Sequence, residues 1–245
     1  MTEFPEHEYI IQTEGLTKKY GFKTVLRNID LSLKRGDFLS LFGPNGAGKT
    51  TLIQTLCSLT TPTSGKVFIA GFHVRHDRES LRKVIGVISH NTFLYNNLSA
   101  FENLKFYGRM YDVPRLHQKI QEITELVGLR EYINDHVCTY SRGMQQRLSV
   151  ARAMIHDPLI LFLDEPFTGL DQHGAEDFKK ILMGCHNEGK TIIMTSHDLI
   201  LGLELCSQAA ILRSGTLVYR EEMSKRVQKD FRRTYFQLTG EKGLS

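Results

Sequence analysis

Long hydrophobic runs are missing from this sequence. The longest uninterrupted apolar stretch is residues 159–163, whereas a helix that crosses a bilayer needs about 20 apolar residues. The acidic N-terminus, Met-Thr-Glu-Phe-Pro-Glu-His-Glu, does not have the basic and apolar regions of a signal peptide. We therefore expect no membrane-spanning segment, so that any membrane role must go through a partner.

Cysteine is scarce and the net charge is small. The four cysteines lie far apart, with no Cys-x-x-Cys pair: Cys57, Cys138, Cys185 and Cys206. This spacing argues against a zinc knuckle or a disulfide framework and fits reduced thiols in a cytosolic protein. The 31 lysines and arginines are nearly balanced by 27 acidic residues, for a net charge of +4, and no basic block occurs in the first 220 residues. We therefore expect no nucleic-acid partner.

The central motif of the chain is Gly-x-x-x-x-Gly-Lys-Thr at residues 43–50. An apolar run at 38–42 predicts a buried strand before it, and the apolar spacing at 52–59 predicts a helix after it. Strand, glycine loop and helix together indicate a phosphate site, because the loop amides and the helix N-terminus both face an anion. We predict that Lys49 reaches the β- and γ-phosphates and that Thr50 binds Mg²⁺. A plain glycine-rich turn is the alternative. The predicted nucleotide-binding residues of this loop are Gly43, Pro44, Asn45, Gly46, Ala47, Gly48, Lys49, Thr50 and Thr51.

Strand and helix patterns alternate at both ends of the chain, around a purely helical middle. Strands are predicted at 9–11, 25–26, 29–33, 66–70, 84–88, 159–163, 191–194, 209–213 and 216–220, with helices at 77–83, 173–187 and 198–205. Between 91 and 156 we expect only helices: 100–110, one opened by Pro114, and one capped by Ser141. The pattern predicts an α/β fold with a core at 1–90 and 157–221, a helical subdomain at 91–156, and a basic helical tail at 222–245.

Polar side chains follow two of the predicted strands. Asp164 and Glu165 end the most apolar strand, where open α/β sheets bind their ligands. Because successive strand residues point to opposite faces, the two carboxylates need different roles. We predict that Asp164 binds Mg²⁺ and that Glu165 polarises an attacking water. His197 follows a later strand and is predicted to contact a γ-phosphate or a water. The alternative for Asp164 and Glu165 is a pair of strand-end carboxylates in solvent, and the alternative for His197 is a surface histidine.

Five motifs in one order resemble the ATP-binding subunits of ABC transporters over nearly the whole chain. They are the loop at 43–51, residues 140–145, the strand at 159–166, residues 168–171, and His197. The resemblance implies a RecA-like P-loop ATPase core with an antiparallel β subdomain and an inserted helical subdomain, in a single domain at 1–245, with ATP and Mg²⁺ as cofactors. It makes Glu165 and His197 catalytic, Tyr20 the base-stacking aromatic, and Asp171 part of an inter-subunit loop.

Two segments depart from the pattern of that family. The signature usually begins Leu-Ser-Gly-Gly-Gln, whereas this chain has Tyr140-Ser141-Arg142-Gly143-Met144. The resemblance implies that this segment contacts ATP held by a second nucleotide-binding subunit, most simply a second copy of the chain. A glutamine usually follows the strand at 84–88, and His90 stands in its place. We predict that His90 is a catalytic residue that senses the γ-phosphate; a loop histidine without contact to the site is the alternative.

The implied function is ATP hydrolysis that powers export through a separate membrane-spanning permease, from the inner face of the cell membrane. The loop at 89–91 and the segment at 94–107 look like the haem-related exporters of cytochrome c maturation. A general drug, lipid or polysaccharide exporter is the alternative. A soluble ABC ATPase is disfavoured because the chain has neither a second ATPase unit nor a long coiled coil. A GTPase is disfavoured because Asn-Lys-x-Asp is missing.

Overall fold

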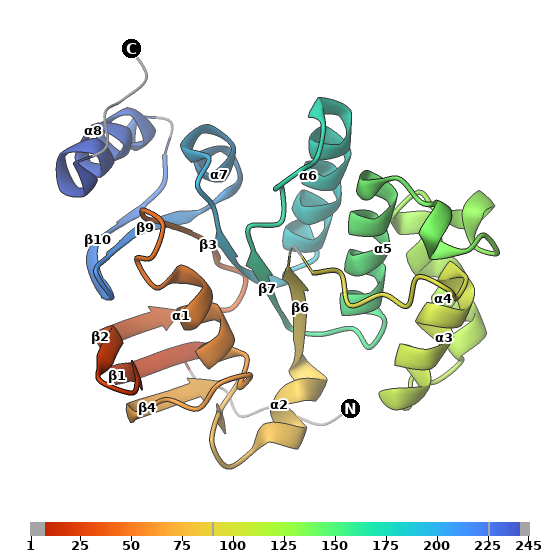
Figure 1. The fold of residues 1–245 in the computed structure, drawn as a ribbon, viewed down its shortest axis with the longest axis horizontal. Helices are drawn as coiled ribbons and strands as arrows, with labels where there is room; N and C mark the ends of the chain where they lie inside the picture. Colours follow the sequence, from red (N-terminus) through yellow and green to blue (C-terminus); the bar gives the residue numbers. More distant parts are fainter. Residues whose placement is uncertain (1–7, 90, 225, 241–245) are drawn as a thin grey trace.

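A computed structural model describes residues 8–89, 91–224 and 226–240. Its larger sheet has the strand order β10-β9-β3-β8-β7-β6 (Figure 1). The strands are β3 (Phe38–Phe42), β6 (Ile85–Ser89), β7 (Ile160–Asp164), β8 (Thr191–Thr195), β9 (Gln208–Arg213) and β10 (Thr216–Glu222). All neighbours pair in parallel except β10, which is antiparallel to β9. Strands β3, β7 and β8 are fully buried, as expected for parallel strands covered on both faces.

A smaller antiparallel sheet has the order β2-β1-β4-β5. Its strands are β1 (Ile11–Tyr20), β2 (Lys23–Leu33), β4 (Ser64–Ile69) and β5 (Phe72–His73). Helix α1 (Lys49–Leu56) shares one hydrophobic cluster with residues of both sheets. Leu39 and Leu41 of β3 belong to this cluster, whereas Phe38 and Phe42 belong to the cluster on the opposite face. The two-residue period of a strand therefore joins β3 to both layers.

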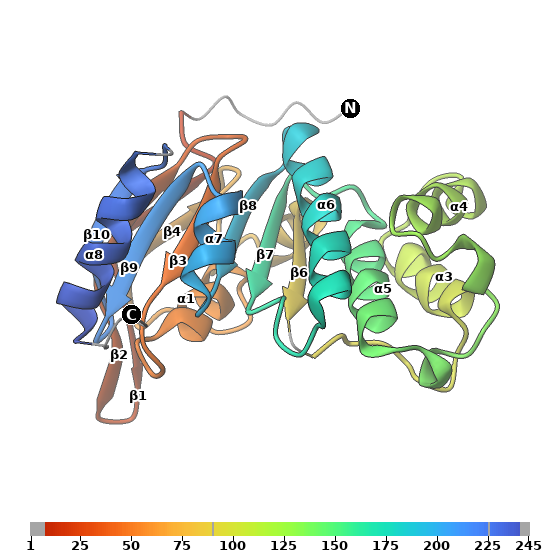
Figure 2. The ribbon, with the colours of Figure 1, turned by 90° about the horizontal axis from the view of Figure 1, so that it is seen from above.

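The second face of the large sheet is covered by helices. They are α5 (Arg142–Met154), α6 (Gln172–Asn187), α7 (Leu199–Leu205) and α8 (Val227–Thr239). Helix α2 (Arg78–Val84) precedes β6, and α3 (Ala100–Met110) and α4 (Leu116–Leu126) follow it, with short 3-10 helices at Arg130–Tyr132 and Val137–Thr139. Helices α3 and α4 lie beyond the β6 edge, at the end of the molecule opposite β10 (Figure 2), and α5 packs against β6. Among the residues that the structure describes, no helix has the length and apolar content needed to cross a bilayer.

Several predicted boundaries differ from those in the structure. Residues 25–26 and 29–33, expected as two strands, form the single strand β2, because both segments pair with β1 across an irregularity in register. Asn28, at the interruption, has φ 48°. Helix α4 begins at Leu116 rather than at Pro114, after Arg115 in a left-handed conformation. The short strand β5 has no counterpart in the prediction, since two residues cannot establish a period.

The tail also begins later than expected. Strand β10 continues to Glu222 because Glu222 still pairs with Gln208 of β9. The helix of the tail is α8, which starts at Val227 instead of 222. Its apolar side chains Phe231 and Tyr235 are buried against the large sheet. Lys225, counted in the basic pattern of this tail, lies outside the described residues.

Candidate nucleotide-binding site

The loop at 43–48 joins β3 to α1 and turns tightly. Gly43 has φ 155°, and a Cβ placed on it would lie 2.2 Å from the carbonyl oxygen of Leu212. Gly48, the residue before α1, has φ 108°. Only glycine accepts this close approach and this backbone conformation without strain. The predicted order of buried strand, glycine loop and helix is therefore confirmed.

Lys49, the first residue of α1, is held over the loop. Its side chain is only 6% exposed, and its Nζ donates to the carbonyl oxygen of Gly43 over 2.6 Å. The same Nζ lies 4.0 Å from Oε1 of Glu165. A cation and a carboxylate that are far apart in the sequence therefore face each other beside the loop.

A cavity of about 590 Å³ opens over this loop. It is lined by Lys23, Thr24, Val25, Arg27, Asn45, Gly46, Ala47, Gly48, Lys49, Thr50, Thr51, Glu165 and Ser214. Three of these side chains, Lys23, Arg27 and Lys49, are cationic, which suits a polyanionic ligand. The volume lies in the range of small-molecule sites. The cavity therefore fits a nucleotide with its phosphates on the loop.

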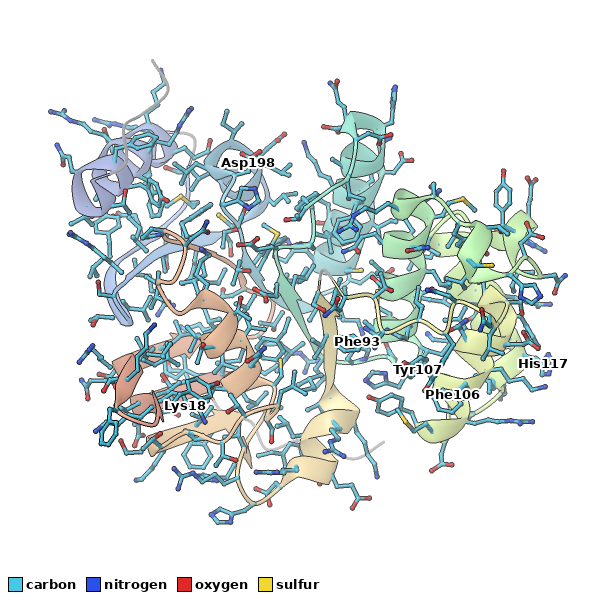
Figure 3. All side chains as sticks on the ribbon, in the orientation of Figure 1. Lys18, Phe93, Phe106, Tyr107, His117 and Asp198 are labelled. Atoms are coloured by element: carbon cyan, nitrogen blue, oxygen red, sulfur yellow. The ribbon has the colours of Figure 1, made fainter. Side chains whose placement is uncertain are left out.

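Tyr20 is not among the residues that line this cavity. It ends β1 and is 48% exposed. Nζ of Lys18, which Figure 3 labels, lies 4.7 Å from the centroid of its ring. Its predicted role in stacking on a base stays a prediction.

Asp164 and Glu165 both turn toward the first turn of α1. Asp164 is buried, and its Oδ1 accepts from the Thr50 hydroxyl over 3.1 Å. Glu165 follows the strand with φ 49°, in the left-handed region. The expectation that the two side chains point to opposite faces is therefore wrong, because the left-handed turn swings Glu165 out of the strand geometry. A non-glycine residue in this conformation is strained and is held there by its surroundings.

Thr195, at the end of β8, supplies part of that support and was missed by the sequence analysis. Its hydroxyl donates to Asp164 Oδ1 over 2.8 Å and accepts from the backbone N–H of Glu165 over 2.9 Å. The β7–β8 register pairs Asp164 with Thr195 directly. A threonine at the end of a neighbouring parallel strand was the available signal. The sequence does not reveal the strand register that places this threonine opposite Asp164.

His197 reaches the same cluster from the loop after β8. Its Nδ1 lies 3.6 Å from Glu165 Oε2, and its side chain is 62% exposed. The next residue, Asp198, accepts from the backbone N–H groups of Ile200 and Leu201 and caps α7 (Figure 3). The structure thus brings Lys49, Glu165 and His197 together, and their predicted roles toward a phosphate and a water stay predictions.

The signature-like segment lies apart from this cavity. The Ser141 hydroxyl accepts from the backbone N–H of Met144 and caps α5, as predicted. Ser141 and Arg142 are exposed and Gly143 is half-buried, and a Cβ placed on Gly143 would meet no described atom beyond its neighbours in the chain closer than 3.9 Å. Arg142 contacts the carbonyl oxygen of Thr168, and Asp171 caps α6. None of these residues lines the cavity over the phosphate loop.

The residues present fit a magnesium ion next to the phosphates. Thr50 and Asp164 offer a hydroxyl and a carboxylate within 3.1 Å of each other. Mg²⁺ prefers oxygen ligands and usually takes few from the protein, with phosphates and waters completing its shell. Among the described residues, no three His, Cys, Asp or Glu side chains gather to form a metal site by themselves.

His90 lies outside the described residues, so its predicted role stays a prediction. Ser89, the residue before it, ends β6 and is paired with Asp164 in the sheet register.

Comparison with known proteins agrees with this geometry. A family model described as ABC transporter matches residues 26–168. The chain is 38% identical over 86% of its length to the uncharacterized ABC transporter ATP-binding protein YdbJ of Bacillus subtilis, covering 68% of that protein. It is 33% identical to the linearmycin resistance ATP-binding protein LnrL of the same organism, over 85% of this chain and 68% of the relative.

Two further proteins extend the match. The bacitracin transport ATP-binding protein BcrA of Enterococcus faecalis is 33% identical, over 95% of this chain and 75% of that one. A solved dimer of the ATP-binding cassette MJ0796 with ADP and Pi superposes with a TM-score of 0.79 at 26% identity, over 87% of this chain and 99% of that one. The chain belongs to the ABC transporter family, as an ATP-binding and ATP-hydrolysing subunit.

Proposed function

We propose that two copies of this chain hydrolyse Mg-ATP at shared sites and drive export through a separate membrane permease, from the cytoplasmic face of the membrane. The observation that carries the proposal is the approach of Lys49 Nζ to Glu165 Oε1, 4.0 Å, beside the phosphate loop. A cation that stabilises transferred phosphate charge and a carboxylate that accepts a proton from water are the two groups that hydrolysis requires.

The other side chains of the cluster orient these two groups. Thr195 holds the backbone of Glu165, and His197 lies beside its carboxylate. Thr50 and Asp164 would hold Mg²⁺, which when bound neutralises phosphate charge. In the proposed reaction Glu165 takes the proton of the attacking water, and Lys49 stays on the phosphates throughout.

The pairing of two chains is supported by the position of the signature-like turn. Ser141 caps α5, and Ser141 and Arg142 are exposed at the start of the helix. A helix N-terminus is suited to an anion, yet this one lies away from the chain's own phosphate loop. We infer that the turn formed by Ser141, Arg142, Gly143 and Met144 faces ATP held by the second copy, with Ser141 and Gly143 as its contacts, next to Asp171 at the start of α6.

The test is the variant Glu165→Gln. We expect turnover to fall by roughly 10²–10⁴, the usual range for a lost general base, while Mg-ATP still binds and now holds two chains together. Size-exclusion chromatography with and without Mg-ATP measures the pairing. Glu188→Gln, which removes an exposed carboxylate at the far end of α6, is the matched control and keeps wild-type turnover. A Glu165→Gln protein that stays monomeric with Mg-ATP, alone and with its permease, contradicts the shared site.

A groove beside β6 is the surface we propose for the permease. It measures about 360 Å³ and lies between β6 and the helices α3 and α5. Its rim carries large exposed apolar side chains: Leu59 is 65% exposed, Phe93 53% and Met110 56%. Clustered exposed apolar groups of this kind mark protein interfaces.

The floor of the groove adds an unbalanced positive charge. The Arg152 guanidinium lies 5.6 Å from the ring centroid of Phe93 and 5.3 Å from that of Tyr107. Phe93 and Tyr107 are labelled in Figure 3. Arg152 Nε and His156 Nδ1 are buried without a hydrogen-bond partner among the described residues. No aspartate or glutamate lines the groove. Arg152 is half-buried, and its Nη2 donates to the carbonyl oxygen of Val87 over 2.6 Å. Because no carboxylate of the groove compensates its charge, we propose that the permease inserts an apolar segment bearing a carboxylate.

Co-purification with the permease tests this surface. The double variant Leu59→Ser, Met110→Ser should lose most of the complex while keeping its melting temperature, since both side chains are exposed. Val218→Ser, an exposed apolar residue on β10, is the matched control and should retain the complex. Full retention by the double variant would place the permease elsewhere.

The cargo is proposed from the names of relatives. Two of the relatives reported above are named for linearmycin resistance and for bacitracin transport, so we propose an exporter of antibiotic-like compounds. The haem-related exporter of cytochrome c maturation is the second candidate and rests on the segment at 89–107. Stimulation of ATP hydrolysis in the reconstituted transporter, by bacitracin in one arm and by haem in the other, separates the two.

A further inference from the structure

The start of α5 is fastened to the turn that follows Glu165 by two side chains, one helical turn apart. Gln146 Nε2 donates to the carbonyl oxygen of Pro166 over 2.9 Å and is buried. Arg142 Nε and Nη2 both donate to the carbonyl oxygen of Thr168, over 3.3 Å and 3.2 Å. Residues four apart lie on one face of a helix, so this face of α5 is hydrogen-bonded to the backbone of residues 166–168.

The turn at residues 166–168 directly follows Glu165 and is hydrogen-bonded to it. The Thr168 N–H donates to the carbonyl oxygen of Glu165 over 3.2 Å, which closes the turn on the residue with the strained φ. A movement of Thr168 is therefore transmitted to Glu165 by the hydrogen bond between the Thr168 N–H and the Glu165 carbonyl oxygen. On the opposite side Glu165 is held by Thr195, so the carboxylate is positioned between a fixed strand end and the start of α5.

Arg142 is an unexpected residue at its position. It is the first residue of α5, where a cation is electrostatically unfavourable because the helix N-terminus is itself positive. Its bonds to Thr168 offset that cost. The fit at the turn is close: a Cβ on Gly169, which has φ 77°, would lie 2.5 Å from Arg142 Nε. The starts of α5 and α6 also adjoin, with Gly174 Cα 4.0 Å from a Cβ placed on Gly143, and the helices run side by side in both views (Figures 1 and 2).

We propose that Arg142 is a positioning residue that couples the two ATP sites of a pair of chains. The α5 turn that would meet ATP held by the partner chain is tied by Arg142 to the turn that carries this chain's own Glu165. Binding of ATP at one site then sets the geometry of the carboxylate at the other. The inference rests on the proposed shared sites, and it assigns to Arg142 a role in communication rather than in contact with phosphate.

The test compares Arg142→Ala with Arg142→Lys, which keeps the charge and one donor. For Arg142→Ala we expect unchanged affinity for the first ATP, a Hill coefficient of hydrolysis that falls to about 1, and a kcat lower by roughly five- to tenfold, the low end of ordinary coupling between sites. In the Glu165→Gln background Arg142→Ala should still pair with Mg-ATP, because Ser141 and Gly143 remain. Arg142→Lys should restore part of the cooperativity.

A double-mutant cycle separates positioning from direct phosphate contact. Gly169→Ala retains the Arg142 side chain but places a Cβ 2.5 Å from its Nε, which displaces the guanidinium from Thr168. It should therefore reproduce the loss of cooperativity, and adding it to Arg142→Ala should change little further. A cooperative Gly169→Ala enzyme, or wild-type kcat and Hill coefficient for Arg142→Ala, overturns the inference while leaving the shared sites intact. Failure of Glu165→Gln itself to pair would remove the shared sites, and this inference with them.

Discussion

Thr195 Oγ1 lies 2.8 Å from Asp164 Oδ1, and the same oxygen accepts the backbone N–H of Glu165. One buried hydroxyl therefore binds both residues of the acidic pair, donating to the first and accepting from the second. Each carboxylate has its own further contact, Asp164 with Thr50 and Glu165 with Lys49. Thr195 thus connects the predicted metal ligand with the predicted proton acceptor, although it is not among the residues that line the cavity over the loop.

Replacing Thr195 by valine should impair both stability and hydrolysis. Valine keeps the shape of threonine but leaves Asp164 and the Glu165 amide each short of one hydrogen bond, which costs about 1–3 kcal/mol for a buried group. We expect a lower melting temperature and a turnover reduced by roughly tenfold, equivalent to about 1.4 kcal/mol. Thermal unfolding and steady-state ATPase rates measure the two effects. Thr195→Ser retains the hydroxyl and should keep most of the activity; equal rates for valine and serine would show that the hydroxyl is not needed.

Lys49→Ala should abolish hydrolysis and weaken ATP binding. The substitution removes the only loop cation that is both buried and beside Glu165 among the described residues, and with it the electrostatic clamp on the β- and γ-phosphates. ATPase rates and nucleotide titration measure the two losses. Lys66→Ala, which removes an exposed lysine paired with Glu14, serves as the control. Wild-type turnover in Lys49→Ala would refute the assignment of the phosphate loop.

His90→Ala should keep nucleotide affinity but lose most hydrolysis and coupling to the permease, and His90→Gln should restore much of both. The prediction rests on the position of His90 in the sequence, directly after Ser89, which pairs with Asp164. A neutral imidazole nitrogen accepts a hydrogen bond from a water, and a glutamine carbonyl does the same. The ATPase rates of the three proteins, with the permease present, decide it: equal rates for wild type and His90→Ala reject the role.

His156 should make the protein less stable in acid. Burial lowers the pKa of His156 to about 4 from its ordinary value near 6.5, and the cation of Arg152 acts in the same direction. Between these two values the unfolded chain binds a proton that the folded chain does not, so stability is complete above about pH 6.5 and is lost as pH falls toward 4.

Melting temperatures between pH 4 and 8 measure this dependence. His156→Gln keeps a donor for the Ile85 carbonyl oxygen, which His156 Nε2 contacts over 2.9 Å, but it carries no titrating group. Its melting temperature should therefore decline less steeply below pH 6.5 than that of the wild type. If the melting temperatures of the two proteins fall equally with pH, the acid sensitivity belongs to other groups.

The predictable part of this protein is the part encoded over short distances in the sequence. The strand at 38–42, the glycine loop and α1 follow one another without a break, so residue type and period alone indicate a phosphate site. The Ser141 cap and the fully buried strand β7 are local patterns of the same kind, and both are present. The alternation of strands and helices likewise predicted the α/β fold. The irregularity at Asn28 led to the prediction of two strands where the structure has the single strand β2.

What the sequence alone determined is therefore the phosphate loop, the acidic pair and the order of the elements, because backbone geometry and periodicity act between near neighbours. Only the tertiary structure decided how Thr195 joins the acidic pair, how Arg142 reaches Thr168, and how Arg152 approaches two aromatic rings. Hydrogen bonds and ring contacts depend on distances of a few ångströms between segments that are tens of residues apart in the chain, and strand register and helix packing set those distances.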